Sequence, residues 1–220
     1  MNEPNPVRLL LASGNPGKLR EVRHALEPHG VTLLASSDVD LPPFPPEDAP
    51  DYRGNAAIKA HHAAKASGLP ALADDSGIEV DALGGAPGVH SARFGGPGLD
   101  DADRVALLLE RLTGVPEEER SARFRASLVL ALPDGRDVVF EGACEGRILH
   151  APAGTQGFGY DPVFFSLDLN EPFGTASLEA KRSVSHRGRA LAHLATWLDT
   201  PTARSFVDPS QVTPPPEKTD

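Results

Sequence analysis

The order of hydrophobic and polar segments predicts an α/β fold, in which helices flank a mixed β-sheet and two lobes border a central cleft. Three observations carry this prediction. Residues 7–12 form an apolar run typical of a buried strand, and a glycine-containing turn leads from it into an amphipathic helix. Residues 52–67 are expected to form a second helix. Residues 124–132 and 137–143 flank a Pro-Asp-Gly-Arg turn, which predicts an antiparallel hairpin that forms the smaller lobe.

The chain has 220 residues, enough for one substantial α/β core and marginal for two domains. We expect residues 1–6 to be a loose leader, residues 7–199 to form a single domain with two lobes, and residues 200–220 to be a disordered Pro-rich tail.

Charge and composition exclude several classes of function. Lys and Arg number 21 against 31 Asp and Glu, and this net charge of −10 argues against nucleic-acid binding and against anionic membranes as partners. The single Cys144 excludes an intramolecular disulfide and suits a reducing compartment. No apolar stretch is long enough to span a membrane, and the N-terminus lacks a signal-peptide pattern. These features predict a cytoplasmic globular protein.

The turn after the first expected strand has the composition of an anion-binding loop. Its glycines let backbone N–H groups approach an anion, and the positive end of the following helix favours negative charge. The glycine spacing differs from that of a Walker loop, so a plain strand-to-helix turn is an equal alternative. The residues of this turn are Ser13, Gly14, Asn15, Pro16, Gly17 and Lys18.

Residues 41–50 are Pro-rich and acidic and are expected to form a surface loop. The helix that follows should be capped by Asp51 and ended by Gly68. On it, Asn55 and Lys59 stand four residues apart and therefore share one face.

The stretch from residue 71 to residue 83 is predicted to form a strand, an acidic turn at Asp74, Asp75, Ser76 and Gly77, and a second strand. Adjacent carboxylates repel one another unless a cation relieves them. Mg²⁺ fits, because it needs only one or two protein carboxylates besides substrate phosphates. An ordinary surface turn is the alternative on this stretch alone.

A glycine-rich stretch, residues 154–165, concentrates aromatic side chains in a chain that has few of them. Phe158 and Tyr160 are candidates for stacking on a flat ligand, and a hydrophobic plug of the core is the alternative. Further on, His186 and Arg187 stand at the start of the expected last helix. Positive charge there is unfavourable for the helix dipole unless the side chains face a ligand.

Taken together, these blocks resemble the inosine triphosphate pyrophosphatase family, also called Ham1-like. They occur in the family's order from about Leu9 to Leu198. The matching segments are Ser13–Lys18, Asn55–Ala60, Ala73–Gly77, Gly84–Gly88, Ser91–Arg93, Gly157–Pro162 and Ser185–Gly188.

The resemblance implies an elongated α/β fold, a homodimer, and Mg²⁺-dependent hydrolysis of non-standard purine nucleoside triphosphates such as ITP, dITP and XTP to the monophosphate and pyrophosphate. It implies that Asp75 is the general base and a metal ligand, and that Lys59 acts with it. The substrate contacts that it implies are the residues of the 13–18 turn, Asn55, Ser76, Arg93, Phe158, Gly159, Tyr160, Asp161, Lys181, His186 and Arg187.

One position departs from the family pattern. The Glu-x-Gly that precedes the second helix in the family, whose Glu is a second Mg²⁺ ligand, reads Glu47-Asp48-Ala49 here. Glu47 aligns by its distance from Asn55, and Asp48 is the alternative ligand. Two other functions remain open from the sequence: a Maf-like nucleotide pyrophosphatase, and a nucleotide-binding sensor without turnover.

Overall fold

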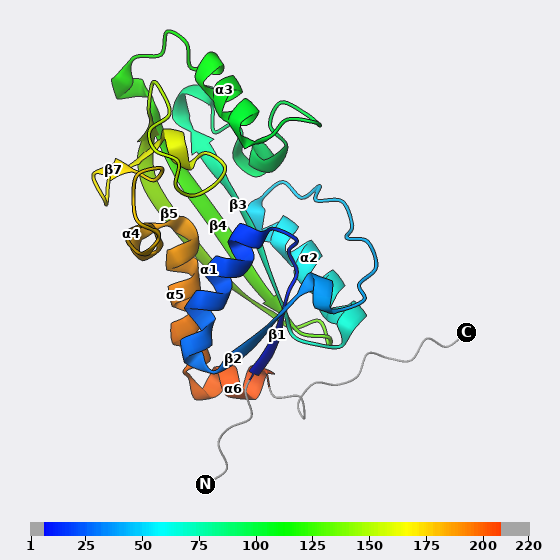
Figure 1. The fold of residues 1–220 in the computed structure, drawn as a ribbon. Coiled ribbons are helices and arrows are strands. Elements are labelled where there is room, and N and C mark those ends of the chain that lie inside the picture. Colours follow the sequence, from blue (N-terminus) through cyan, green and yellow to red (C-terminus); the bar gives the residue numbers. More distant parts are fainter. Residues whose placement is uncertain (1–6, 208–220) are drawn as a thin grey trace. The chain divides into compact units, whose positions relative to one another are not determined.

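The computed structural model describes residues 7–207 and confirms the α/β class with a mixed sheet (Figure 1). The sheet has seven strands in the order β2-β1-β3-β4-β5-β6-β7. Strand β1 is parallel to β2 and β3, whereas β6 is antiparallel to β5 and β7. The strands are β1 (Val7–Leu11), β2 (Val31–Ala35), β3 (Ala71–Val80), β4 (Ser121–Ala131), β5 (Asp137–Ile148), β6 (Phe164–Ser166) and β7 (Glu171–Pro172). The α-helices are α1 (Pro16–Leu26), α2 (Tyr52–Ser67), α3 (Asp101–Arg111), α4 (Leu178–Val184), α5 (His186–Leu198) and α6 (Pro201–Val207).

The described chain folds into two compact units. Within the described residues, unit 1 comprises residues 7–75, 127–140 and 191–207, and unit 2 comprises Ser76–Ala126 and Glu141–Ala190. Strands β3, β4 and β5 and helix α5 each contribute residues to both units. In β3 the change from one unit to the other falls between the consecutive residues Asp75 and Ser76.

Unit 1 has a core of small side chains. Helix α2 presents four fully buried alanines, and they pack in one cluster with residues of β1, β3 and β4. Small side chains let a helix approach a sheet closely, which explains the alanine-rich sequence of α2. The helix begins and ends as predicted, because the Asp51 side chain accepts from Gly54 N–H (2.7 Å) and Gly68 adopts a left-handed conformation with φ 69°. The four alanines are Ala56, Ala60, Ala63 and Ala64.

Unit 2 has a core of larger side chains. Three aromatic rings, Phe124, Phe164 and Phe173, lie within 4.6 to 6.1 Å of one another, measured between centroids. Helix α3 contributes Val105 and Leu108 to the same cluster. Asp100 caps this helix as predicted.

The expected acidic turn within residues 71–83 is wrong, because β3 runs without interruption from Ala71 to Val80. Gly77 does not have a positive φ angle, so it makes no sharp turn. Strand β3 lies between β1 and β4 in the sheet, and β1 pairs with its first two residues, Ala71 and Leu72. The carboxylates of Asp74 and Asp75 therefore extend from a strand, on which consecutive side chains point to opposite faces.

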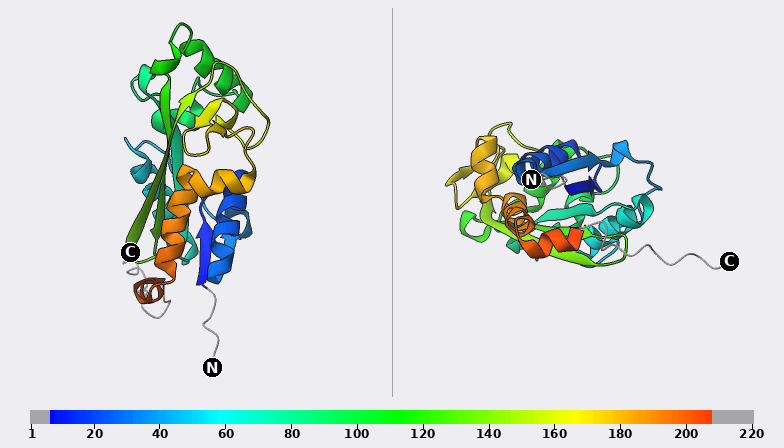
Figure 2. Two further views of the ribbon diagram at one scale, coloured as in Figure 1. Left: turned by 90° about the vertical axis from the view of Figure 1, so that its left-hand side faces the viewer. Right: turned by 90° about the horizontal axis from the view of Figure 1, so that it is seen from below.

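The expected disordered tail begins with a helix, so this prediction is wrong for residues 201–207. Helix α6 follows α5 closely (Figure 2). Thr200 caps it by accepting from Ala203 N–H (3.1 Å), and the Phe206 ring lies edge-on to Trp197 at 5.4 Å between centroids. The Phe206 ring and the buried Ala203 and Val207 hold this segment in place, and the sequence analysis did not weigh these side chains. Residues 1–6 and 208–220, on which the remaining predictions about the termini fall, lie outside the described residues.

Among residues 7–207, no helix combines the length and the apolar character that crossing a membrane requires.

Candidate active site

The first group of predicted site residues lies in unit 1, around Asp75. This side chain is largely buried, accepts from Asn55 Nδ2 (3.1 Å), and has Lys59 Nζ 3.5 Å from its Oδ1. Burial raises the pKa of the Asp75 carboxyl above its usual value, although Lys59 and Asn55 act in the opposite direction. A carboxyl with a raised pKa, held by an amide and an ammonium group, has the properties of a general base.

Lys59 brings the acidic groups of unit 1 together. Its ammonium group lies 3.1 Å from Glu47 Oε2, 3.5 Å from Asp75 Oδ1 and 3.1 Å from the backbone oxygen of Asp74. The ammonium on α2 thus connects the Pro-rich loop with strand β3.

Asn55 makes a parallel connection between the same two segments. Its Oδ1 accepts from Ala49 N–H (3.0 Å) while its Nδ2 donates to Asp75. The two helix residues that share a face in the sequence therefore hold the loop and the strand from one side.

Asp74 forms a second ion pair in unit 1, on the other face of β3. Its side chain is completely buried (0% exposed), and Lys18 Nζ lies 3.1 Å from its Oδ2 and also donates to its backbone oxygen (3.1 Å). The sequence analysis did not place Asp74 among the site residues. A strand at this place would have put Asp74 and Asp75 on opposite faces, but the sequence analysis predicted a turn at these residues.

The glycine-containing turn joins β1 to α1, as predicted. Asn15 caps α1 by accepting from Gly17 N–H (2.8 Å) and Lys18 N–H (3.2 Å), and Ser13 Oγ accepts from Asn15 N–H (3.2 Å). Pro16 stands in the first turn of the helix, and Gly14 is exposed with open space around its Cα. The side chains of the turn thus occupy two N–H groups at the helix start in this structure.

Two carboxylates in unit 1 are placed where a divalent cation could bind. Glu47 and Asp75 both lie against the ammonium group of Lys59, so this position already attracts a positive charge. Asp48 is exposed, which favours Glu47 in the choice between the two loop residues. Within residues 7–207, no group of three or more His, Cys, Asp or Glu side chains is arranged to hold a metal ion by itself. Mg²⁺ commonly completes such a shell with substrate phosphates and water.

The second group of predicted residues lies in unit 2, around Asp161. This carboxylate is buried, lies 2.6 Å from Lys181 Nζ, and accepts from Phe158 N–H (2.7 Å). Gly157 has φ +83°, and a Cβ there would collide with Asp161 Oδ2, so only glycine fits. Asp161 therefore shapes the glycine-rich loop from within.

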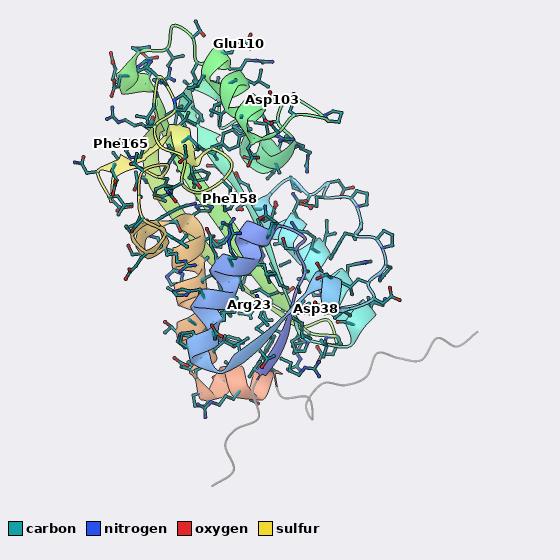
Figure 3. The ribbon with its side chains drawn as sticks, viewed as in Figure 1. Arg23, Asp38, Asp103, Glu110, Phe158 and Phe165 are labelled. Carbon is teal, nitrogen blue, oxygen red and sulfur yellow. The ribbon has the colours of Figure 1, made fainter. Side chains whose placement is uncertain are left out.

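Phe158, labelled in Figure 3, is half-buried and carries two cations near its ring. Lys181 Nζ lies 4.9 Å and Arg187 Cζ 5.6 Å from the ring centroid. Arg187 is itself buried and donates from Nη2 to Ser76 Oγ (2.8 Å). This aromatic ring with its cations can stack on a flat, electron-rich ligand.

His186, Tyr160 and Arg93 occupy different surroundings in unit 2. The His186 ring stacks on Phe124 at 4.7 Å and is buried. Tyr160 is buried, donates to the backbone oxygen of Ser91 (2.9 Å), and has its pKa raised by burial. Its ring is therefore part of the core. Arg93 is exposed, on a short 3₁₀ helix (Gly88–Arg93), where its Nε donates to His90 Nδ1 (3.2 Å).

Two further residues of unit 2 hold the glycine-rich loop: Asp101, which the sequence analysis missed, and Ser91, which it named only as part of a matching segment. Gly159 N–H donates to Asp101 Oδ2 (2.8 Å) at the start of α3, and Ser91 anchors Tyr160. Asp101 looks from the sequence like one more acidic residue of a helix N-terminus, so its partner could not be foreseen.

Comparisons with known proteins agree on one family. A sequence profile of the Ham1 family matches residues 9–197. The chain is 51% identical over 199 residues to a dITP/XTP pyrophosphatase of Thermus thermophilus, and the aligned region covers 90% of this chain and 95% of that protein. It is 49% identical over 194 residues to a dITP/XTP pyrophosphatase of Geobacter sulfurreducens (87% of this chain, 96% of that protein).

Solved structures show the same likeness. A HAM1 protein from Coxiella burnetii superposes with a TM-score of 0.81 at 37% identity, covering 87% of this chain and 98% of that one. A nucleoside-triphosphatase / dITP/XTP pyrophosphatase from Mycobacterium abscessus gives 0.71 at 45% identity, covering 86% and 98%.

Proposed function

The chain belongs to the Ham1 family, and on that premise we propose that it hydrolyses non-standard purine nucleoside triphosphates (dITP, XTP and ITP) to the monophosphate and pyrophosphate. The names of its relatives support this substrate class. The observation in the structure that carries the proposal is the buried Asp75, held by Asn55 and Lys59, with Lys18 paired to the neighbouring Asp74. A base next to two ammonium groups fits phosphoryl transfer better than nucleotide binding alone.

In the proposed reaction, water attacks the triphosphate and the bond between the α- and β-phosphates breaks. Asp75 takes the proton of the attacking water, and pyrophosphate leaves with the electrons of the broken bond. Lys18 and Lys59 bind phosphate oxygens and stabilise the negative charge that is redistributed in the transition state. Asn55 keeps the Asp75 carboxylate oriented towards the water.

Glu47 and Asp75 are the residues that we propose to hold Mg²⁺. Their shared contact with the Lys59 ammonium supports this assignment, because two carboxylates at one position favour a cation there. Bound Mg²⁺ supplies neutralisation of phosphate charge, which Lys18 and Lys59 complete.

We propose that the purine stacks on Phe158 and that Arg187 recognises its 6-oxo group. A 6-oxo group is an acceptor, whereas the 6-amino group of adenine is a donor and leaves a donor in the site unpaired. Backbone N–H groups of the glycine-rich loop could also donate to a 6-oxo group, but those of Phe158 and Gly159 already donate to Asp161 and Asp101. Arg187 is therefore the better candidate. Guanine shares the 6-oxo group, so the discrimination against guanine has to act on its 2-amino group, at the other edge of the ring.

The test measures pyrophosphate release from ITP, XTP, GTP and ATP with Mg²⁺ and with EDTA. We expect release from ITP and XTP with Mg²⁺, and a much lower kcat/KM for GTP and ATP. Binding of ITP without pyrophosphate release in the presence of Mg²⁺ would favour the sensor instead. Equal kcat/KM values for ITP and GTP would refute the selectivity.

We also propose a cytoplasmic homodimer, which the resemblance to the family suggests. Light scattering coupled to size-exclusion chromatography tests the assembly, and a monomer at micromolar concentration contradicts it.

A further inference from the structure

Three consecutive residues of the glycine-rich loop in unit 2 are held by three different acceptors. Phe158 N–H donates to Asp161 Oδ2 (2.7 Å), Gly159 N–H donates to Asp101 Oδ2 (2.8 Å), and the Tyr160 hydroxyl donates to the Ser91 backbone oxygen (2.9 Å). The acceptors on either side belong to buried residues. Asp101 differs from them, because its side chain is 61% exposed and comes from α3, 58 residues away in the chain.

Helix α3 is itself fixed to the segment that leads into this loop. The buried Arg120 donates from Nη1 to Leu112 O (3.0 Å), at the end of α3, and from Nε to Ile148 O (2.8 Å), at the end of β5. It also donates from Nη2 to Leu149 O (2.9 Å). One end of α3 is thus attached to the chain just before the loop, and its other end is attached to the loop through Asp101.

The contact falls on the residue that directly follows Phe158. Gly159 has φ +61°, a conformation that glycine enters and leaves easily, so an external acceptor is needed to hold its peptide group in one orientation. We infer that Asp101 is a positioning residue for Phe158: it fixes the Gly159 N–H and thereby keeps the aromatic ring ready to receive the purine. This inference rests on the proposed function, in which Phe158 stacks on the base.

The experiment compares three variants by steady-state kinetics with ITP. Asp101→Ala removes the acceptor, whereas Asp101→Asn removes the charge but keeps an acceptor oxygen. Asp103→Ala, at the position labelled in Figure 3, is the matched control. It removes another carboxylate from the same helix turn and also weakens the α3 cap, since Asp103 Oδ2 accepts from Asp100 N–H (3.1 Å), but it leaves the Gly159 contact intact.

For Asp101→Ala we expect the KM for ITP to rise about two- to tenfold with kcat within about twofold, which is the range that one hydrogen bond allows. Inorganic tripolyphosphate, which has no base, should inhibit the wild type and this variant with the same Ki. Asp101→Asn and Asp103→Ala should keep the wild-type KM.

Four outcomes overturn the inference. They are an unchanged KM in Asp101→Ala, a lowered KM, an equal rise in Asp103→Ala, and a parallel rise in the Ki for tripolyphosphate. Hydrogen–deuterium exchange of residues 154–163 gives a readout without turnover, and it should be faster in Asp101→Ala than in Asp103→Ala. If the wild type releases no pyrophosphate, the proposed function fails. The exchange experiment still tests the inference in that case, because an unchanged exchange rate in Asp101→Ala would refute the role of the contact between Asp101 and Gly159.

Discussion

Replacing Asp75 by asparagine should separate catalysis from binding in this protein. The substitution keeps the size of the side chain but removes the proposed base and one proposed metal ligand. Loss of a general base typically lowers kcat by about 10²- to 10⁴-fold, which corresponds to about 2.7 to 5.4 kcal/mol in the activation free energy. Lys18 and Lys59, which we propose to bind phosphate, remain in place, so the KM for ITP should change far less than kcat.

The same substitution should stabilise the fold, because burial raises the pKa of Asp75 in the folded protein above the ordinary value of 3.8. The folded state then binds the proton more tightly than the unfolded state, so the wild type loses stability as the pH rises from 3.8 through the folded-state pKa. The asparagine side chain of the variant is neutral at every pH. The variant should therefore have a higher Tm than the wild type at pH 7, and the difference should vanish at a pH well below 3.8.

Steady-state kinetics and thermal melts at pH 3 and pH 7 measure both effects. Asp74→Asn is the matched control, since Asp74 is the adjacent buried carboxylate and pairs with Lys18 instead of Lys59. A kcat within a few-fold of the wild type in Asp75→Asn would refute its role as the base and move that role to Asp74. A lower Tm of Asp75→Asn than of the wild type at pH 7 would refute the electrostatic reasoning but not the role of Asp75 as the base.

Three further predictions follow from other contacts. Phe206→Ala removes the ring contact with Trp197 and should lower the free energy of unfolding by about 1 to 2 kcal/mol in urea denaturation, with unchanged kcat; equal stability would mean that α6 does not dock through this ring. Burial raises the pKa of the Cys144 thiol to about 11, so the native protein at pH 8 should react with a disulfide reagent far more slowly than the urea-unfolded protein; similar rates would show that the thiol is accessible. Phe158→Ala should raise the KM for all purine triphosphates alike. Arg187→Ala should instead lower the ratio of the kcat/KM for ITP to the kcat/KM for ATP. An unchanged ratio would show that Arg187 does not recognise the base.

The features that depend on local sequence were predictable. The start and end of α2 at Asp51 and Gly68, and the capping of α3 by Asp100, follow from side chains that bond to the backbone within a few residues. The α/β class follows from hydrophobic periodicity, which also depends on near neighbours.

Features that depend on partners distant in the chain were not predictable. Asp74-Asp75-Ser76-Gly77 has the composition of a turn, yet it lies within β3, an interior strand of the sheet between β1 and β4. Likewise, the sequence places Asp161 and Lys181 in the site but cannot show that they bind each other at 2.6 Å. The helix at residues 201–207 depends on Trp197 in the preceding helix, and a Pro-rich composition conceals that contact.

The two lysines that we propose to bind phosphate are both paired with carboxylates, and this pairing has a consequence for the release of product. Lys18 with Asp74, and Lys59 with Glu47 and Asp75, are already neutralised before any nucleotide arrives. An incoming anion has to compete with these carboxylates, and a triphosphate, which carries more negative charge than a monophosphate, competes better. Once pyrophosphate has departed, the carboxylates can form their ion pairs with the lysines again, and the monophosphate then binds more weakly. The internal ion pairs thus favour turnover over product inhibition.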